Sequence, residues 1–529
     1  MFVDARTVAS GAIIQTGICI VGGGAAGITL ARALRDSRIP VALLESGGLE
    51  FDSATQELET GQMIGLRNYP TDVSRLRYFG GTTNHWSGTS RPFEASDFEQ
   101  QPSIPLSGWP LRRDALLPYY RQAQDICQLG PFDYDAAFWM HKAGRPPAAF
   151  DPARLQPTVF QISPPTRFGE VYREDLKSAD NVTVYLNANA VDVQANATAS
   201  TVERIKVATL GGPSFTISAR LFVLAAGGLE NPRILLLSRG VQPAGLGNTY
   251  DIVGRYFMDH PYFLGGGFVV FSEPDPPLPL MILGMKEPVV PAFATLAATA
   301  RPEGTAGFQV LVQGIGRIIT GVDSLKTVAS SFAHLSTPDN LWEHIGNIIR
   351  DRDAIADNAY RTIARTRSSW FLSGDKVTVP HAASLDVLLE QVPNPDSRVT
   401  LSGMKDALGQ QRLALNWQFT DVERRTYRHA LEMAALEFGR LGLGRVKIKP
   451  LPERGWPDDL LGANHHIGTT RMSDDPKTGV VDGNCRVHGI SNLYMAGSSV
   501  FPTSTFANPT LTIVAMSLRL ADELRRQIA

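Results

Sequence analysis

The sequence predicts an α/β fold with two parts: a Rossmann-like sheet, and a second α+β domain built on an antiparallel sheet. Two observations predict the first part. A glycine-rich turn joins a buried strand to a helix near the N-terminus, and two later segments run as strand, loop and helix. A third observation predicts the second part, because residues 383–420 read as a strand, an Asn-Pro-Asp turn and two more strands. A chain of 529 residues suggests about three or four domain-sized units.

Composition excludes several classes of protein. Lys plus Arg is 50 and Asp plus Glu is 52, which gives a net charge of -2. This balance lacks the excess positive charge that is typical of proteins that bind nucleic acid or an anionic membrane. The three cysteines are too few and too scattered for a disulfide framework or a zinc module. There is no apolar run long enough to span a membrane, and the N-terminus lacks the basic start and apolar stretch of a signal peptide. We therefore expect a cytoplasmic protein.

Residues 18–50 have the order of a βαβ unit. A short apolar strand runs into the motif G-x-G-x-x-G and then into a helix, and a second apolar strand ends in Glu45. The glycines of the motif are Gly22, Gly24 and Gly27. They permit a tight turn and the close approach of a pyrophosphate to the helix N-terminus, and Glu45 would accept hydrogen bonds from ribose hydroxyls. This unit alone fits FAD or NAD.

Three further segments favour FAD. Residues 221–238 read as a buried strand, a glycine pair and a helix, and residues 492–522 as a strand, a polar loop and a helix that opens at Asn508-Pro509-Thr510. Residues 78–93 contain the pair Gly80-Gly81, where a flat or bulky ligand can approach the backbone. An NAD enzyme has no obvious use for a second glycine-rich site so near the first.

Five motifs together carry a family resemblance. IVGGGAAG, FGGTTNHW, AAGGLENPRILL, VGRYFMDHP and HHIGTTRM…GSSVFPTSTFANPTLT follow one another in an order that resembles the glucose-methanol-choline oxidoreductase family over nearly the whole chain. Within it the sequence is most similar to the branch of pyranose 2-oxidase, C-glycoside 3-oxidase and fructose dehydrogenase, because Asn508 stands where other branches often carry a second histidine. The resemblance implies FAD as cofactor and oxidation of an alcohol, commonly on a sugar.

The resemblance also implies a Rossmann-like FAD-binding domain that is discontinuous in the sequence. We expect this domain in residues 1–95, 181–262 and 459–529, the last of which carries the catalytic motif. Residues 96–180 would supply mixed elements of the substrate domain, and residues 263–458 the substrate-binding domain itself.

Three segments of the middle region have patterns of their own. Residues 272–291 contain six prolines and predict a loop or an edge segment. Residues 325–366 look like two polar helices, which could be a lid, an oligomer contact or, in the interpretation we favour, a solvated hairpin. Residues 421–441 predict an amphipathic helix.

The resemblance assigns the catalytic base to His465, the first histidine of ANHHIGTTRM. A histidine suits this task, because its ordinary pKa lies near neutral pH and lets it take the alcohol proton as hydride leaves the carbon. The alternative is a buried structural imidazole. Adjacent residues on an extended segment point to opposite sides, so we interpret His466 as structural or as a neighbour of the site. A metal is not expected, because no third ligand lies at metal-binding spacing.

Asn508 admits two compatible interpretations. It is a favoured residue for capping the last helix, with Pro509 at the first helical position. Its amide would also bind the substrate oxygen, while the helix N-terminus directs partial positive charge at the reduced flavin.

His85 occupies the place where pyranose 2-oxidases attach the flavin covalently, but we expect a noncovalent contact. Trp86 beside it could be core or could wall the flavin. The residues that we predict to bind the cofactor are Gly22, Gly24, Ala26, Gly27, Glu45, Gly80, Gly81, Asn84, His85, Trp86, Ala226, Gly497, Asn508, Pro509 and Thr510.

Two classes of function stay open. The first is a flavoenzyme that oxidises a small-molecule alcohol, with His465 as base and flavin N5 as hydride acceptor. Its substrate would be a sugar or glycoside secondary hydroxyl, or alternatively an aliphatic, aromatic or steroid alcohol, and its electron acceptor oxygen, a quinone or a partner redox subunit. The second is a flavin-binding protein without turnover, or an NAD-linked dehydrogenase. His465 with Asn508 argues against a mere binder, the glycine-rich segments argue against NAD, and no G-x-S-x-G of a serine hydrolase occurs.

Overall fold

The computed structural model describes residues 1–102, 104–144, 149–164, 166–272, 288–296, 302, 304–314, 324–325, 328–329, 331, 341–350, 352 and 382–528. Most of our predictions for residues 272–291 and 325–366 lie outside these residues. Within the second segment, Leu341–Arg350 form helix α9. At the end of the first, strand β12 (Val289–Ala294) is paired on both sides, so this part of the segment is not an edge.

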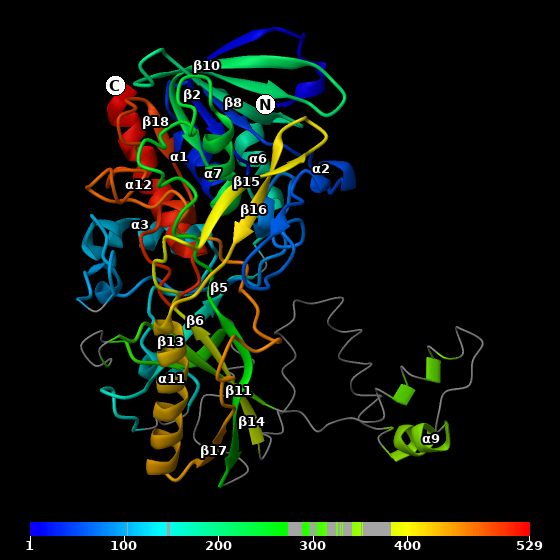
Figure 1. Ribbon diagram of the computed structural model, residues 1–529, viewed down its shortest axis with the longest axis vertical. Coiled ribbons are helices and arrows are strands. Elements are labelled where there is room, and N and C mark those ends of the chain that lie inside the picture. The colour runs from blue at the N-terminus through cyan, green and yellow to red at the C-terminus, as the bar shows by residue number, and fades with distance from the viewer. Residues whose placement is uncertain are drawn as a thin grey trace.

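Among the described residues, one sheet has eight strands and lies in the upper half of the molecule (Figure 1). Its order is β1-β7-β3-β2-β10-β9-β8, and β18 also pairs with β10. The bounds are β1 Phe2–Asp4, β2 Ile13–Val21, β3 Val41–Leu44, β7 Val182–Leu186, β8 Asn189–Ala195, β9 Val202–Ala208, β10 Ser214–Leu224 and β18 Leu493–Met495. The pairs β2–β3, β2–β10 and β10–β18 are parallel, which confirms the Rossmann-like prediction.

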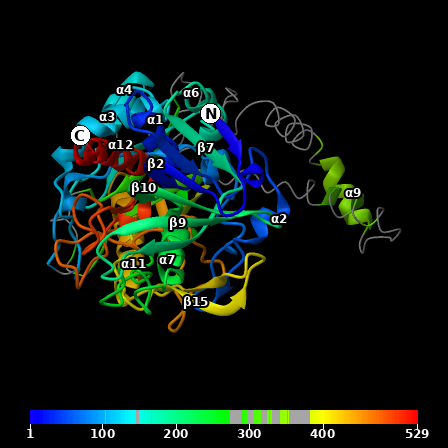
Figure 2. The same ribbon diagram turned by 90° about the horizontal axis from the view of Figure 1, so that it is seen from above.

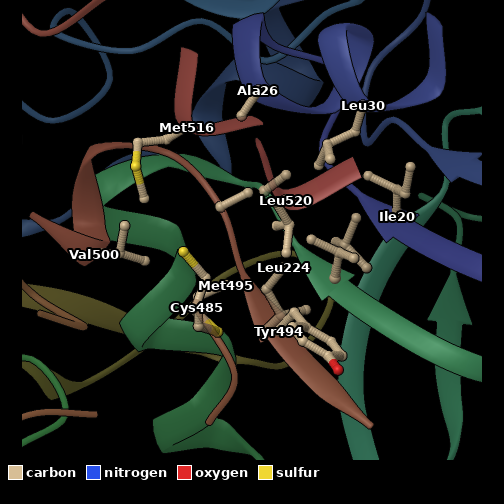
Figure 3. Packing of buried hydrophobic residues seen from close by; sticks show 14 of the residues in the cluster. Ile20, Ala26, Leu30, Leu224, Cys485, Tyr494, Met495, Val500, Met516 and Leu520 are labelled. Carbon is tan, nitrogen blue, oxygen red and sulfur yellow. The ribbon is translucent and has the colours of Figure 1, made fainter. Parts of the chain in front are cut away.

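Helices cover both faces of this sheet. Helices α1 (Ala25–Leu34), α3 (Arg113–Ile126) and α12 (Thr510–Ile528) lie on one side of β2 and β10, and α7 (Gly227–Leu237) lies on the other (Figure 2). Residues from β2, β10, β18, α1 and α12 form one continuous core, as Ile20, Leu224, Met495, Leu30 and Leu520 show (Figure 3). This packing explains why the strand at residues 18–21 reads as an unbroken apolar run, since both of its faces are covered.

The second large sheet lies below the first and, in the part of the chain that the structure describes, has seven strands (Figure 1). Its order is β17-β11-β14-β13-β12-β6-β5, and all neighbouring strands in it are antiparallel. The bounds are β5 Thr89–Ser90, β6 Gln156–Ile162, β11 Tyr262–Phe271, β12 as above, β13 Phe308–Gly314, β14 Ala382–Leu389 and β17 Gly444–Ile448. The predicted amphipathic helix is α11 (Asp421–Arg440), which buries Tyr427, Leu431 and Phe438 in the core of this sheet.

Our prediction that residues 383–420 form one antiparallel sheet is wrong in part. Only β14 joins the large sheet, whereas β15 (Arg398–Lys405) and β16 (Gln411–Asn416) form a separate sheet with β4 (Gln62–Met63). Leu413, Leu415 and Trp417 pack against Leu229 of α7 in a small core of their own. The burial of these side chains beside the first domain therefore determines which sheet the strands join.

The remaining α-helices of the described residues are short: α2 (Ser53–Glu57), α4 (Ala136–Lys142), α5 (Phe168–Val171) and α6 (Arg173–Lys177). Strands of the first sheet lie within residues 1–95, 181–262 and 459–529, while β5 and β6 contribute to the second sheet. The domain limits stay a prediction. Of the helices that the structure describes, none is long and apolar enough to cross a membrane.

Candidate active site

A cavity of about 450 Å³ lies where four parallel strands of the first sheet end. Its lining includes Gly22 after β2, Glu45 after β3, Ala226 after β10 and Gly497 after β18. Ligands of open α/β sheets bind beyond the carboxyl ends of parallel strands. The glycine-rich segments that the sequence singles out therefore converge on one place.

Most of the predicted site residues line this cavity. They are Gly22, Gly24, Ala26, Glu45, Gly81, His85, Trp86, Ala226, His465, Gly497, Asn508, Pro509 and Thr510.

Three predicted cofactor contacts, Gly27, Gly80 and Asn84, do not line the cavity but support its wall. A Cβ on Gly27 would overlap the carbonyl oxygen of Gly22, so this glycine lets α1 pack against the turn. Gly80 has φ 103° and donates its N–H to the carbonyl of Gly23 at 2.8 Å. The amide of Asn84 donates to the carbonyl of Phe79 at 2.9 Å.

Part of the cavity wall is main chain without side chains, which lets a dinucleotide approach the backbone closely. A Cβ built on Gly24, Gly227 or Gly497 would meet no protein atom within 4 Å, although all three residues line the cavity. Gly24 is also the N-cap of α1, and the first N–H groups of a helix bind phosphate well. These residues would hold the pyrophosphate and the flat ring system of a flavin dinucleotide.

Glu45 is buried beside the glycine-rich turn. Its carboxylate accepts hydrogen bonds from the N–H of Gly23 at 2.8 Å and from the N–H of Gly47 at 2.9 Å. Burial raises the pKa of Glu45, and these hydrogen bonds and the nearby Arg77 oppose that rise. The carboxylate lines the cavity at the end of β3, and its contact with a ribose stays a prediction.

A buried cluster of charged residues, which the sequence analysis missed, forms another part of the wall. Arg77 Nε lies 2.9 Å from Glu59 Oε1, and Arg233 bridges Glu230 at 2.7 Å and Asp406 at 2.6 Å. Arg75 pairs with both glutamates. Burial opposes the ionisation of Glu230, but Arg233, Arg77 and Arg75 outweigh it and lower its pKa. Three guanidiniums thus compensate three carboxylates, all of them more than 85% hidden from solvent.

His85 lies at the open side of the cavity, and its Nε2 is 2.8 Å from the hydroxyl of Tyr78. Trp86 is half-buried against the hydrophobic core and lines the cavity, and its Nε1 donates to the carbonyl of Thr166 at 3.1 Å. Its contact with a flavin stays a prediction.

Because the Tyr78 hydroxyl occupies His85 Nε2, we expect acid precipitation of the purified protein to release most of its flavin into the supernatant. The measurement is flavin absorbance in the supernatant and in the pellet. A pellet that stays yellow in the wild type and becomes colourless in His85→Ala would contradict this expectation.

His465 and Asn508 meet inside the cavity, although 43 residues separate them. The distance between His465 Nε2 and Asn508 Nδ2 is 3.5 Å. The start of the last helix differs by one residue from our prediction, because the carbonyl of Pro509 accepts the N–H of Ile513 at 2.8 Å and α12 begins at Thr510. Asn508 therefore precedes the cap position, and its amide faces the cavity instead.

His466 also lines the cavity, so the argument that only one of the two histidines faces it is wrong. Asn464, which directly precedes the two histidines, has φ 60°, so the chain turns sharply just before them. Burial, together with the charge of Arg75, lowers the pKa of His466 to about 3 and keeps its ring neutral. Within the described part of the chain, no group of three or more His, Cys, Asp and Glu side chains could hold a metal ion.

Two residues from the motif VGRYFMDHP contact His465, and the sequence analysis gave neither of them a role. His260 Nδ1 lies 2.7 Å from His465 Nδ1. Asp259 accepts the main-chain N–H groups of His465 at 2.9 Å and of Ala463 at 3.1 Å. Burial lowers the pKa of His465 well below its ordinary value, and His260 and His466 lower it further. The ring of His465 is therefore neutral and carries a lone pair.

A Rossmann-like sheet, a glycine-lined dinucleotide cavity and a neutral histidine inside it define a flavin-dependent oxidoreductase. Sequence models agree: one described as FAD dependent oxidoreductase matches residues 17–245, and one described as GMC oxidoreductase matches residues 393–517. The GMC oxidoreductase model, together with matches to fructose dehydrogenase, C-glycoside 3-oxidase and pyranose 2-oxidase, supports membership of the glucose-methanol-choline (GMC) oxidoreductase family, and the cofactor is FAD.

Relatives include both sugar and non-sugar enzymes. The chain is 26% identical over 318 residues to the fructose dehydrogenase large subunit of Gluconobacter japonicus, a match that covers 59% of this chain and 48% of that protein. It is 33% identical over 129 residues to the C-glycoside 3-oxidase of Microbacterium trichothecenolyticum, covering 23% and 24% of the two chains. It is 22% identical over 586 residues to the 2-methyl-1,2-propanediol dehydrogenase of Mycolicibacterium austroafricanum, covering 97% and 96%.

Among solved structures, formate oxidase of Aspergillus oryzae superposes with a TM-score of 0.55 at 18% identity. This similarity covers 98% of the present chain and 99% of that one, and it shows a shared fold.

Proposed function

We propose that this protein oxidises a ring secondary hydroxyl of a sugar or glycoside, with His465 as the base that removes the hydroxyl proton. The observation that carries the proposal is the pair of His465 Nε2 and Asn508 Nδ2, which lie 3.5 Å apart in the FAD cavity. One group can accept a proton and the other can donate a hydrogen bond. A hydroxyl oxygen that lies beside this pair, within hydrogen-bond distance of both nitrogens, would meet both requirements of alcohol oxidation.

Each side chain has a distinct task in this proposal. The amide of Asn508 donates to the substrate oxygen and orients it, and His465 takes the hydroxyl proton as the C–H bond breaks. Bound FAD supplies the acceptor of the hydride. His465 is ready to act as a base because burial keeps its pKa low and its ring neutral.

The proposed substrate class is supported by the names of two relatives. Fructose dehydrogenase is named for a sugar, and C-glycoside 3-oxidase for position 3, which in a pyranose ring carries a secondary hydroxyl. A non-sugar alcohol is the second candidate, because the long match to 2-methyl-1,2-propanediol dehydrogenase covers 97% of this chain.

A substrate panel separates the two candidates. The purified protein is mixed without oxygen with D-glucose, D-fructose, a methyl glucoside, a C-glycoside, a 1,2-diol and benzyl alcohol, and bleaching of the flavin is followed. Turnover is then measured with oxygen and with a dye acceptor. We expect bleaching by at least one sugar or glycoside. Bleaching by the diol or benzyl alcohol with no response to any sugar would favour the second candidate.

We expect Asn508→Ala to slow anaerobic flavin reduction by about 10- to 100-fold, because the substrate oxygen loses one hydrogen bond while the base stays in place. Stopped-flow absorbance measures the rate. Asn484→Ala is the control, since Asn484 is exposed, accepts a hydrogen bond from Arg519 and does not line the cavity. Equal rates for Asn508→Ala and the wild type would remove Asn508 from the mechanism.

A further inference from the structure

We propose that His260 is a positioning residue that holds His465 in the tautomer with a bare Nε2, so that Nε2 faces the substrate as the base. This inference rests on the proposed function, because it concerns the base of that reaction. Neither the family resemblance nor the sequence motifs assign His260 a role. The assignment comes from three hydrogen bonds whose directions depend on one another.

The first bond fixes the proton on His260. Its Nε2 lies 3.1 Å from the main-chain carbonyl oxygen of Ser504. A carbonyl oxygen can only accept, so His260 Nε2 carries the hydrogen. A neutral imidazole has one N–H, and burial lowers the pKa of His260 to about 4, so the ring is neutral near pH 7. The Nδ1 of His260 is therefore an acceptor.

The second bond transfers this constraint to the base. His465 Nδ1 lies 2.7 Å from His260 Nδ1, and one of these two nitrogens must donate. Because His260 Nδ1 accepts, His465 Nδ1 carries the hydrogen, and the Nε2 of the neutral ring is left with a lone pair. The third contact agrees, since the amide nitrogen of Asn508 faces this Nε2 at 3.5 Å and can only donate.

The backbone on both sides of the contact is held in place. Asp259 accepts the N–H of His260 at 2.8 Å as well as the N–H of His465 at 2.9 Å, so one carboxylate oxygen joins the two histidine segments. Asn464 has φ 60° and Thr505 has φ 54°, and these residues adjoin His465 and Ser504. Non-glycine residues keep such a conformation where the surrounding structure imposes it.

The contact has a second consequence once His465 has taken the proton. The imidazolium then donates its Nδ1–H to a neutral His260, and hydrogen bonds from charged donors are stronger than those between neutral groups. Without His260, that N–H would lose this acceptor, and only the 3.5 Å contact with Asn508 would still favour the tautomer with a bare Nε2. His260 is thus expected to matter both before and after proton transfer.

Nitrogen NMR tests the tautomers directly. The holoprotein, which contains 10 histidines, is labelled with [15N]histidine, and two-bond correlations between ring nitrogens and ring C–H protons are recorded in the oxidised state. His465→Gln and His260→Gln identify the two rings by the signals that they remove. We expect His465 protonated on Nδ1 and His260 protonated on Nε2. A His465 ring protonated on Nε2 overturns the proposal.

This measurement needs no substrate, so its failure is distinct from failure of the proposed function. If no alcohol of the panel bleaches the flavin but the NMR pattern is as expected, the proposed function fails and the positioning of His465 stands.

Two variants then test the consequence for rate. His260→Asn keeps an acceptor near the position of Nδ1, whereas His260→Gln keeps a donor near the position of Nε2. With the panel sugar that reduces the wild type fastest, we expect Gln to slow flavin reduction by about 10- to 100-fold and Asn to restore most of the rate. His465 should show one tautomer in the Asn variant and a mixture in the Gln variant.

His488→Gln is the matched control, because its Nε2 also lies 2.9 Å from a main-chain carbonyl, that of Ser473, outside the cavity. Equal losses in the Asn and Gln variants, with the His465 tautomer unchanged in both, would show that His260 acts only on the stability of the fold. If neither variant folds, the NMR pattern of the wild type decides the question.

Discussion

We expect His465→Ala to slow anaerobic flavin reduction by about 10²- to 10⁴-fold while the protein still binds FAD. Without a base to take the hydroxyl proton, the alcohol would become a protonated carbonyl when its hydride leaves. Removing a positioned base therefore raises the barrier to hydride transfer by about 3–5 kcal/mol. FAD binding should persist, because the glycine-rich segments that line the cavity are untouched. Stopped-flow absorbance gives the rate, and the flavin to protein ratio gives the binding.

His466→Ala is the informative comparison, because it removes the neighbouring imidazole from the same cavity. The ring of His466 lies against Phe257, with centroids 5.9 Å apart, and the contact with Asn508 belongs to His465. We therefore expect His466→Ala to keep most of the rate. A severe loss in His466→Ala together with a normal rate in His465→Ala would mean that the base is assigned one residue too early.

The glycine motifs could be interpreted from the sequence because the conformation that they indicate depends on residues close together in the chain. Few folds contain a strand that is apolar at every position and is followed by G-x-G-x-x-G and a helix. In such folds the carboxyl ends of the parallel strands meet at one edge of the sheet. Glu45, Ala226 and Gly497 could thus be placed together although they lie far apart in the chain.

The contacts that the sequence did not reveal depend on long-range packing. His260 lies 205 residues from His465, and a motif with a histidine in it does not say which ring it touches. The same holds for β15 and β16, whose alternating pattern predicts strands but not the sheet that they join. Tertiary burial of Leu413 and Leu415 makes that choice.

The buried charged cluster was invisible for the same reason, and it carries the second prediction. Glu59, Arg75, Arg77, Glu230 and Asp406 look like ordinary surface residues in the sequence, since charged side chains are seldom buried without partners. In the fold these residues form ion pairs with one another and with Arg233 beside the FAD cavity. Removing one carboxylate leaves three guanidiniums with two carboxylates at a place where every one of these side chains is more than 85% hidden from solvent.

Glu230→Gln should therefore lower the free energy of unfolding of the FAD-binding domain by about 3–5 kcal/mol, the usual effect of breaking a buried ion pair. The lowered pKa of Glu230 means that its contribution is present above the pKa of the unfolded chain and is lost as the pH falls through the folded value. Urea unfolding at neutral pH, followed by circular dichroism, measures the change. Asp4→Asn is the control, because Asp4 and Arg6 are 37% and 59% exposed and such pairs contribute about 0–1 kcal/mol. Equal stabilities for the two variants would show that the cluster is no more important than a surface pair.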